Sequence, residues 1–188
     1  MIVKESPLRG IKYGSASTVS IREIPDLPAF DLRISPNTIT QALVAEALGF
    51  ELPTKIGHVA RGSVFNGDEA HALCLAPDWW LIVGSREVEQ KITSGISKSD
   101  HHFSLVDVSG QRTTIELEGP KASELLAHLW DQDLREKSFP VARVRQGLMA
   151  KALVIVWHIG QFHYRVMVRS SFALHLWKTL EDAMEEWD

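Results

Sequence analysis

The stretch TTIELEGPKASELLAHLW, residues 113–130, decides the fold. Its first part alternates apolar or β-branched residues with polar ones, which is the period of a strand with one buried face. Gly119 and Pro120 then end the strand and open a helix, since proline is tolerated in the first helical turn. The apolar residues of that helix lie on one face: Ala122, Leu125, Leu126, Leu129 and Trp130. An amphipathic strand is therefore followed at once by an amphipathic helix.

Three more strands and a second helix follow this pair. Apolar and β-branched runs predict strands at 144–149, 153–157 and 162–168. Ser170 or Ser171 is expected to cap a final helix with an apolar stripe at helical spacing. The strand at 153–157 is apolar at consecutive positions, so we expect both of its faces to be covered.

The first half of the chain has the same order of elements. A strand is predicted at 30–34, and Ser35 and Pro36 are expected to open a helix that ends at Gly49. Three strands and a second helix are predicted at 58–65, 70–75, 79–83 and 85–96.

The two halves are in register, which indicates a duplication. Pro36 and Pro120 are 84 residues apart, and Ser85 and Ser170 are 85 apart. The sequence therefore predicts an α+β fold made of two β-α-β-β-β-α halves with antiparallel sheets. We expect residues 1–28 to form an N-terminal extension, in which the alternating run 18–24 could be an edge strand, and 29–188 to form a single domain of two pseudo-repeats, 29–98 and 101–188.

Length and charge exclude several classes of protein. The 188 residues carry 20 Lys and Arg against 24 Asp and Glu, a formal net charge of −4, which gives no overall electrostatic reason to expect nucleic acid. The sequence has no Rossmann or Walker phosphate loop and no apolar run of the length that a membrane span needs. The amino terminus lacks the apolar stretch of a signal peptide, so a cytoplasmic location is expected.

Few side chains are candidates for chemistry. Cys74 lies in an apolar run and is expected to be a small buried hydrophobe rather than a nucleophile. Asp107 ends a strand and is either a buried acid or base or, the favoured interpretation, the hydrogen-bond acceptor of a turn. His158 and His163 flank a turn across which they could approach each other, but no Asp, Glu or Cys cluster completes a metal site around them. The sequence predicts no catalytic, cofactor-binding or metal-ligating residue.

Four arginines are candidates for contact with a partner or an anion. Arg143 and Arg145 share one face of their predicted strand, and Arg165 and Arg169 share one face of theirs. If the two strands pack near each other, the four form a cationic patch that accepts a carboxylate or an acidic subunit surface. A solvated outer face is the alternative.

Several segments resemble known families. The run LVDVSGQRTTIELEGPKASELL (105–126) is similar to the strand, turn, strand and Gly-Pro-helix segment of the glycine-cleavage T-protein-like superfamily. The segments LGFELP (48–53), ALCLAPDWWLIVG (72–84) and FHYRVMVRSSFALHLWKTLEDA (162–183) narrow the resemblance to the sarcosine oxidase gamma-subunit family. The similarity covers most of the chain from about residue 30 onward.

The resemblance implies both a fold and a role. It implies the folate-binding-domain fold and membership, with alpha, beta and delta subunits, in an assembly that oxidises sarcosine. FAD, FMN and NAD are expected in the larger subunits, tetrahydrofolate is the one-carbon acceptor, and the gamma subunit is expected to bind none of them. A complete aminomethyltransferase is about twice as long, and the KGCYxGQE segment of related iron-sulfur-cluster assembly proteins is absent.

The sequence allows three functions. The first is a non-catalytic subunit of heterotetrameric sarcosine oxidase that acts by assembly and stabilisation. The second is a stand-alone folate-binding or aminomethyltransferase-like protein, which only the fold supports. The third, a metal hydrolase built on the histidines, has the weakest basis.

Overall fold

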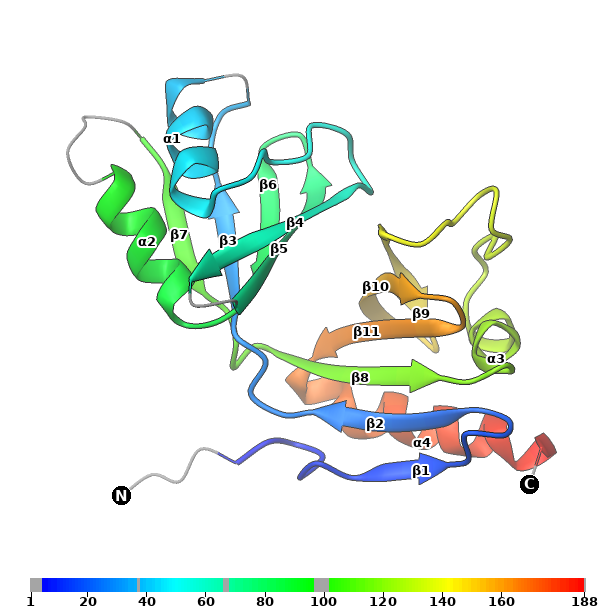
Figure 1. Ribbon diagram of the computed structural model, residues 1–188. Helices are drawn as coiled ribbons and strands as arrows, with labels where there is room; N and C mark the ends of the chain where they lie inside the picture. The colour runs from blue at the N-terminus through cyan, green and yellow to red at the C-terminus, as the bar shows by residue number, and fades with distance from the viewer. Residues whose placement is uncertain (1–4, 37, 66–67, 97–101, 188) are drawn as a thin grey trace. The chain divides into compact units, whose positions relative to one another are not determined.

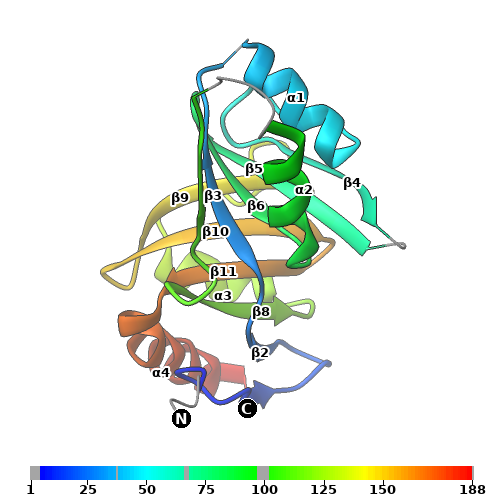
Figure 2. The ribbon, with the colours of Figure 1, turned by 90° about the vertical axis from the view of Figure 1, so that its left-hand side faces the viewer.

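The protein divides into two compact units. The computed structural model describes residues 5–36, 38–65, 68–96 and 102–187. One unit contains residues 1–26 and 110–188, and the other contains 27–109. Each has one antiparallel sheet and two main helices (Figures 1 and 2). No helix in the described part of the chain is long and apolar enough to cross a membrane.

The first unit has a six-stranded sheet in the order β1-β2-β8-β11-β10-β9. Its strands are β1 (Lys12–Gly14), β2 (Ser20–Ile24), β8 (Arg112–Glu118), β9 (Arg143–Met149), β10 (Ala152–Gly160) and β11 (His163–Arg169). Helices α3 (Ala122–Leu129) and α4 (Ala173–Met184) bury their apolar stripes in the core cluster of this unit. The short 3-10 helices η1 (Ser170–Phe172) and η2 (Glu185–Trp187) flank α4. The apolar stripe predicted for the final helix is thus confirmed.

The second unit has a five-stranded sheet in the order β4-β5-β6-β3-β7. Its strands are β3 (Ala29–Arg33), β4 (Val59–Phe65), β5 (Asp68–Ala76), β6 (Trp79–Val83) and β7 (Ser104–Asp107). Helices α1 (Ile39–Leu48) and α2 (Glu87–Ile96) join the core of this unit. Cys74 and Trp80 lie in the same core, and Trp80 donates its indole N–H to the Pro53 carbonyl at 2.8 Å.

The predicted order of elements occurs in both units. β3, α1, β4, β5, β6 and α2 match β8, α3, β9, β10, β11 and α4, and the sheet orders correspond. Each half is preceded in the chain by a strand that pairs with the other half. β2 precedes β3 but pairs with β8, and β7 precedes β8 but pairs with β3. The strand that the sequence allowed at 18–24, within the expected N-terminal extension, is thus present as β2, but it lies between β1 and β8 and not at the edge of the sheet. The break between the predicted repeats, at 99–100, lies outside the described residues.

Strand β10 has two buried faces over most of its length. Val154, Ile155, Val156 and Trp157 are all buried, which confirms the expectation from their consecutive apolar character. Leu153, which was included in that expectation, is exposed. The prediction is wrong there because Leu153 lies close to the β9–β10 turn, at the end of the sheet.

Two helices begin later than the sequence predicted. Thr38 is the N-cap of α1, and its Oγ1 accepts the Gln41 N–H, so Ser35 and Pro36 precede the helix. Helix α4 follows η1 directly and has no side-chain cap, and the hydroxyl of Ser170 donates instead to the Gly110 carbonyl. The end of α1 at Gly49 is confirmed, with φ +78° in the left-handed region.

Gly119 is required where β8 turns toward α3. Its φ is +135°, and a Cβ there would lie 2.5 Å from the carbonyl oxygen of Thr18. The chain passes this close because Lys121 donates its backbone N–H to the same carbonyl at 2.9 Å. The Gly-Pro pair thus lies before α3, whose N-cap is Lys121, so this helix also begins later than the sequence predicted.

We predict that Gly119→Ala destabilises the chain much more than Gly10→Ala. Both glycines have positive φ, but a Cβ at Gly10 meets nothing within 4 Å. The Gly10 variant should lose about 1 kcal/mol of unfolding free energy from left-handed strain, and the Gly119 variant about 3 kcal/mol or more because backbone must also shift. Chemical denaturation measures both, and equal losses would contradict the close approach to Thr18.

Candidate functional site

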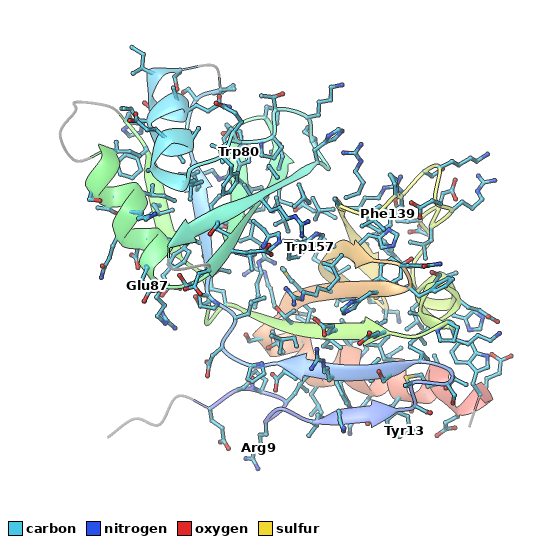
Figure 3. The ribbon with its side chains drawn as sticks, in the orientation of Figure 1. Arg9, Tyr13, Trp80, Glu87, Phe139 and Trp157 are labelled. Carbon is cyan, nitrogen blue, oxygen red and sulfur yellow. The ribbon has the colours of Figure 1, made fainter. Side chains whose placement is uncertain are left out.

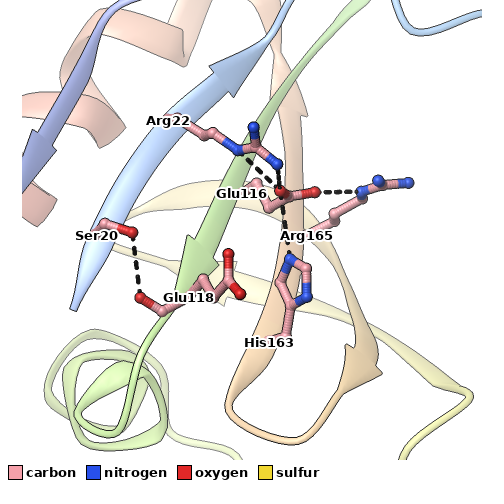
Figure 4. Close-up of polar contacts among 6 residues, drawn as sticks. All are labelled: Ser20, Arg22, Glu116, Glu118, His163 and Arg165. Carbon is pink, nitrogen blue, oxygen red and sulfur yellow. Dashed lines mark hydrogen bonds and ion pairs between the residues drawn. The ribbon is translucent and has the colours of Figure 1, made fainter. Parts of the chain in front are cut away.

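A buried carboxylate lies at the centre of the six-stranded sheet. Glu116, on β8, has an exposed fraction of 1% and lies directly opposite Arg22 of β2 and Arg165 of β11 (Figure 4). Cross-strand partners share a face, so the three form a row on the face opposite the helices. Arg22 Nε donates to Glu116 Oε1 at 2.9 Å and Arg165 Nε donates to Oε2 at 2.8 Å, while Arg22 Nη2 makes a further bond to Oε1.

The two arginines keep Glu116 ionised. Burial by itself raises the pKa of Glu116, but the hydrogen bonds and positive charges of Arg165 and Arg22 outweigh it, and the net pKa lies below the ordinary value of 4.5. His163 Nε2 lies 3.3 Å from Oε1, on the same side of the sheet. The arrangement is an ion-pair network whose oxygens are already engaged by donors.

The same cluster contains a possible set of metal ligands. One oxygen each from Glu116 and Glu118 and a ring nitrogen of His163 lie within 4.8 Å of one another. A divalent cation would have to compete with Arg22 and Arg165 for the Glu116 oxygens and would sit beside two fixed positive charges. The donor set therefore favours a structural ion-pair network over a metal centre.

The four candidate arginines do not form a single patch. β10 separates β9 from β11, and the pairing register places Arg143 and Arg145 on the face opposite Arg165 and Arg169. Arg145 donates to the carbonyls of Asp133 and Ser138, at 3.0 and 2.6 Å. The single patch that the sequence allowed is therefore not formed, because the sequence shows which residues share a face within a strand but not how the faces of two strands match. Contact of the individual arginines with a partner or an anion stays a prediction.

A cavity of about 500 Å³ lies in the same unit, on the helix side of the sheet. His158 lies among its lining residues, stacked on Tyr164 with ring centroids 4.4 Å apart. Nδ1 of His158 lies 2.8 Å from the carbonyl of Phe139, a residue labelled in Figure 3. A carbonyl only accepts, so this nitrogen carries the proton. The lining residues are Ser123, Leu134, Glu136, Val141, His158, Gln161, Phe162 and Tyr164.

The register of the β10–β11 hairpin separates the two candidate histidines. His158 pairs with Tyr164 and faces the core, whereas His163 pairs with Gly160 and Glu118 and faces Glu116. They cannot act together on one ion, which rules out the approach across the turn that the sequence left open. Tyr164 shares a 2.8 Å hydrogen bond with Ser123, and burial raises the pKa of its phenol.

The other two reactive candidates have structural roles, as predicted. Cys74 is fully buried, and burial raises the pKa of its thiol. Asp107 Oδ1 accepts the backbone N–H of Ser109 at 2.8 Å and its hydroxyl at 2.6 Å, and these bonds lower the pKa of Asp107. The turn interpretation of Asp107 is therefore confirmed.

The sequence reasoning missed Glu116 as a site residue. It lies in the stretch that decides the fold, at a position where simple alternation places a solvent-facing residue. The signal that could have found it is the expected burial of both faces of the apolar strand 153–157 in the same sheet, because a carboxylate on a sheet that is covered on both faces needs cationic partners.

Comparison with known proteins gives a consistent picture. The model of the family described as "Sarcosine oxidase, gamma subunit family" matches residues 35–186. The sarcosine oxidase subunit gamma of Corynebacterium sp. (strain P-1) is 31% identical over 173 residues, which are 92% of this chain and 83% of that protein. The relative from Arthrobacter sp. is 28% identical over 173 residues, again 92% of this chain and 83% of that one.

Solved structures agree with the sequence matches. A chain of the heterotetrameric sarcosine oxidase from Corynebacterium sp. U-96, in complex with pyrrole 2-carboxylate, superposes with a TM-score of 0.85 and 27% identity over 97% of this chain and 95% of that one. Aminomethyltransferase T of the glycine cleavage system from Bartonella henselae gives a TM-score of 0.68 at 13% identity, covering 94% of this chain and 56% of that one. The second likeness concerns the fold alone and confirms the predicted T-protein-like fold.

We predict that Glu116→Gln lowers the unfolding free energy by about 2 kcal/mol at pH 7, because it removes charge-assisted hydrogen bonds. The folded-state pKa of Glu116 is lowered, so the contribution is complete above the unfolded pKa and is lost as pH falls through the folded pKa. The difference between variant and wild type should therefore shrink below about pH 4. Urea denaturation across pH measures it.

Glu118→Gln is the matched control for that measurement. Glu118 is on the same strand and face, but its side chain is exposed. The Glu118→Gln variant should lose no more than about 0.5 kcal/mol of unfolding free energy. Equal losses for the two variants at pH 7 would show that the arginine network does not stabilise the fold.

Proposed function

The chain belongs to the sarcosine oxidase gamma subunit family, and on that premise we propose that it is a small, non-catalytic subunit of a heterotetrameric sarcosine oxidase. The observation that carries the proposal is the match to a chain of such an oxidase over nearly the full length of both proteins. Its contribution is to assemble and stabilise the complex with alpha, beta and delta subunits.

The proposed assembly performs the oxidative demethylation of sarcosine, with tetrahydrofolate as the one-carbon acceptor. FAD, FMN and NAD belong to the other subunits in this proposal, and this chain binds none of them. The cytoplasmic location expected from the sequence stays a prediction.

The contacts of the reactive side chains support a structural role. The carboxylate of Glu116 is held by two arginines, and Asp107 closes a turn. Cys74 is packed in a core. Each of these groups has a contact that accounts for its presence without chemistry on a substrate, so in this proposal the chain contributes to the oxidase through its surfaces.

A stand-alone folate-binding or aminomethyltransferase-like protein remains the alternative. The observation that favours it is the fold shared with aminomethyltransferase T, of which this chain covers only 56%. A shared fold at 13% identity does not carry the activity over.

We predict that omitting this chain from co-expression of the four subunits leaves a less stable complex. A subunit that stabilises by binding shifts the equilibrium away from dissociated and unfolded states, so the midpoint of thermal inactivation should fall by several degrees. Size-exclusion chromatography should show the wild-type chain eluting with the other subunits. Separate elution, with an unchanged inactivation midpoint, would contradict the proposed function.

We also predict that the purified isolated chain is colourless and shows no saturable binding of tetrahydrofolate in the micromolar range. Absorption between about 350 and 480 nm tests for flavin, and isothermal titration under anaerobic conditions tests for folate. The assembled oxidase is the positive control for both measurements. Stoichiometric flavin would overturn the cofactor assignment, and saturable folate binding would favour the stand-alone alternative.

A further inference from the structure

One third of the positive charge of the chain lies in a segment without acidic residues. Residues 137–180 contain seven lysines and arginines and no aspartate or glutamate, although the whole chain has a net charge of −4. The segment builds β9, β10, β11, η1 and most of α4. The seven residues are Lys137, Arg143, Arg145, Lys151, Arg165, Arg169 and Lys178.

Among these basic residues, Arg169 has no counter-charge within the described part of the chain. Arg165 is neutralised by Glu116, and Arg145 is bound by backbone carbonyls. Arg169 is exposed at the end of β11, and its cross-strand partner is Arg112. In the parts of the chain that the structure describes, no carboxylate lies within the 4.0 Å of a salt bridge to Arg169. An anion placed here would supply Arg169 with a counter-charge and would be stabilising.

Two exposed leucines lie beside this charge. Leu148 of β9 and Leu153 of β10 are cross-strand partners, with exposed fractions of 59% and 65%. The next pair along β10 and β11 is Val154 with Val168, which places Leu153 next to Arg169 on the same face. Lys151, in the β9–β10 turn, is also exposed. We call Leu148, Lys151, Leu153 and Arg169 the hairpin patch.

We propose that the hairpin patch is a contact surface for another subunit of the oxidase, one that presents apolar side chains around a carboxylate that pairs with Arg169. Adjacent apolar side chains are typical of the buried core of an interface, and arginine is enriched among the residues that contribute most to binding. The inference rests on the proposed function and names a surface for it.

The charge of the patch selects this occupant over a second copy of the chain. A symmetric contact between two copies would bring Lys151 and Arg169 against the same basic residues of the other copy. An acidic face of a different subunit supplies a counter-charge to Arg169 instead of adding further positive charge. Of the four arginines that the sequence suggested for partner contact, Arg169 alone belongs to the hairpin patch.

The test measures binding of the full chain to the complex of the other three subunits, expressed without it. The variants are Arg169→Glu, Arg169→Lys and the double variant Leu148→Ser with Leu153→Ser. Lys178→Glu is the matched charge control, since Lys178 is an exposed base of the same acid-free segment. Ile39→Ser, with an exposed fraction of 68%, is the matched apolar control in the other unit. Circular dichroism checks that each variant is folded.

We expect Arg169→Glu to raise the Kd at least about tenfold at about 50 mM salt and by much less at about 500 mM, because salt screens the lost attraction. The double leucine variant should raise the Kd by a similar factor at both salt concentrations. Arg169→Lys should keep most of the affinity at low salt, and both controls should bind like the wild type.

Three outcomes separate the inference from the proposed function. If the wild type binds and the patch variants bind equally well, the hairpin patch is not the interface, and the proposed function stands. If the folded wild-type chain does not bind the other subunits, the proposed function itself fails. If the free chain forms a dimer that the patch variants abolish, the occupant is a second copy, and the inference is overturned.

Discussion

The burial of both faces of the six-stranded sheet is the constraint on which the rest of this unit depends. Thr114, Glu116, Ile155, Trp157 and Met167 lie on the face opposite the helices, and all are buried. A carboxylate on such a face is costly unless it is paired and hydrogen-bonded. Arg22 and Arg165 meet this requirement from the two neighbouring strands.

The pairing of Glu116 also specifies the register of three strands. A shift of β2 or β11 by one residue would move its arginine to the helix face and leave Glu116 with an uncompensated charge. The same shift would turn Ile21 or Val166 out of the core cluster. Apolar burial and ion pairing therefore select the same register, and local and global preferences agree.

Exchange of strands between the two halves explains why the amino-terminal segment matters. β2 precedes β3 in the chain but pairs with β8, and β7 precedes β8 but pairs with β3. Neither half therefore completes its sheet from its own strands. Because Arg22 comes from β2, the ion-pair network depends on a segment for which the sequence suggested an N-terminal extension with a possible edge strand.

The sequence predicted most of the fold because its signals are local. Periodicity located the strands and helices of both halves, and Gly49 marked the end of α1. Helix starts were less certain, since Ser35 and Thr38 are both good caps and the choice depends on where the chain turns after β3. The burial of Cys74 and the turn at Asp107 followed from their immediate neighbours in the sequence.

The network and the arginine faces could not be predicted because they depend on strand order. Alternation shows that Arg143 and Arg145 share a face, but the relation of that face to the face of Arg165 depends on the register of β9 against β10 and of β10 against β11. Glu116 gave the same difficulty, since its partners are 94 and 49 residues away along the chain. Non-local pairing, rather than weak local signals, limited the prediction of the site.

The net charge of the chain does not show its local charge distribution, which matters most for binding a partner. A net charge of −4 gave no overall electrostatic reason to expect nucleic acid, yet residues 137–180 have no acidic residue and the remainder of the chain carries all 24. Within this segment the sheet neutralises Arg165 through Glu116 of β8 and holds Arg145 with backbone carbonyls. Arg169, at the end of β11, is bound neither by Glu116 nor by those carbonyls, and it lies next to exposed leucines. Because association is steered by the charge near a contact and screened beyond about 10 Å, the local distribution and not the total determines which partner surface fits.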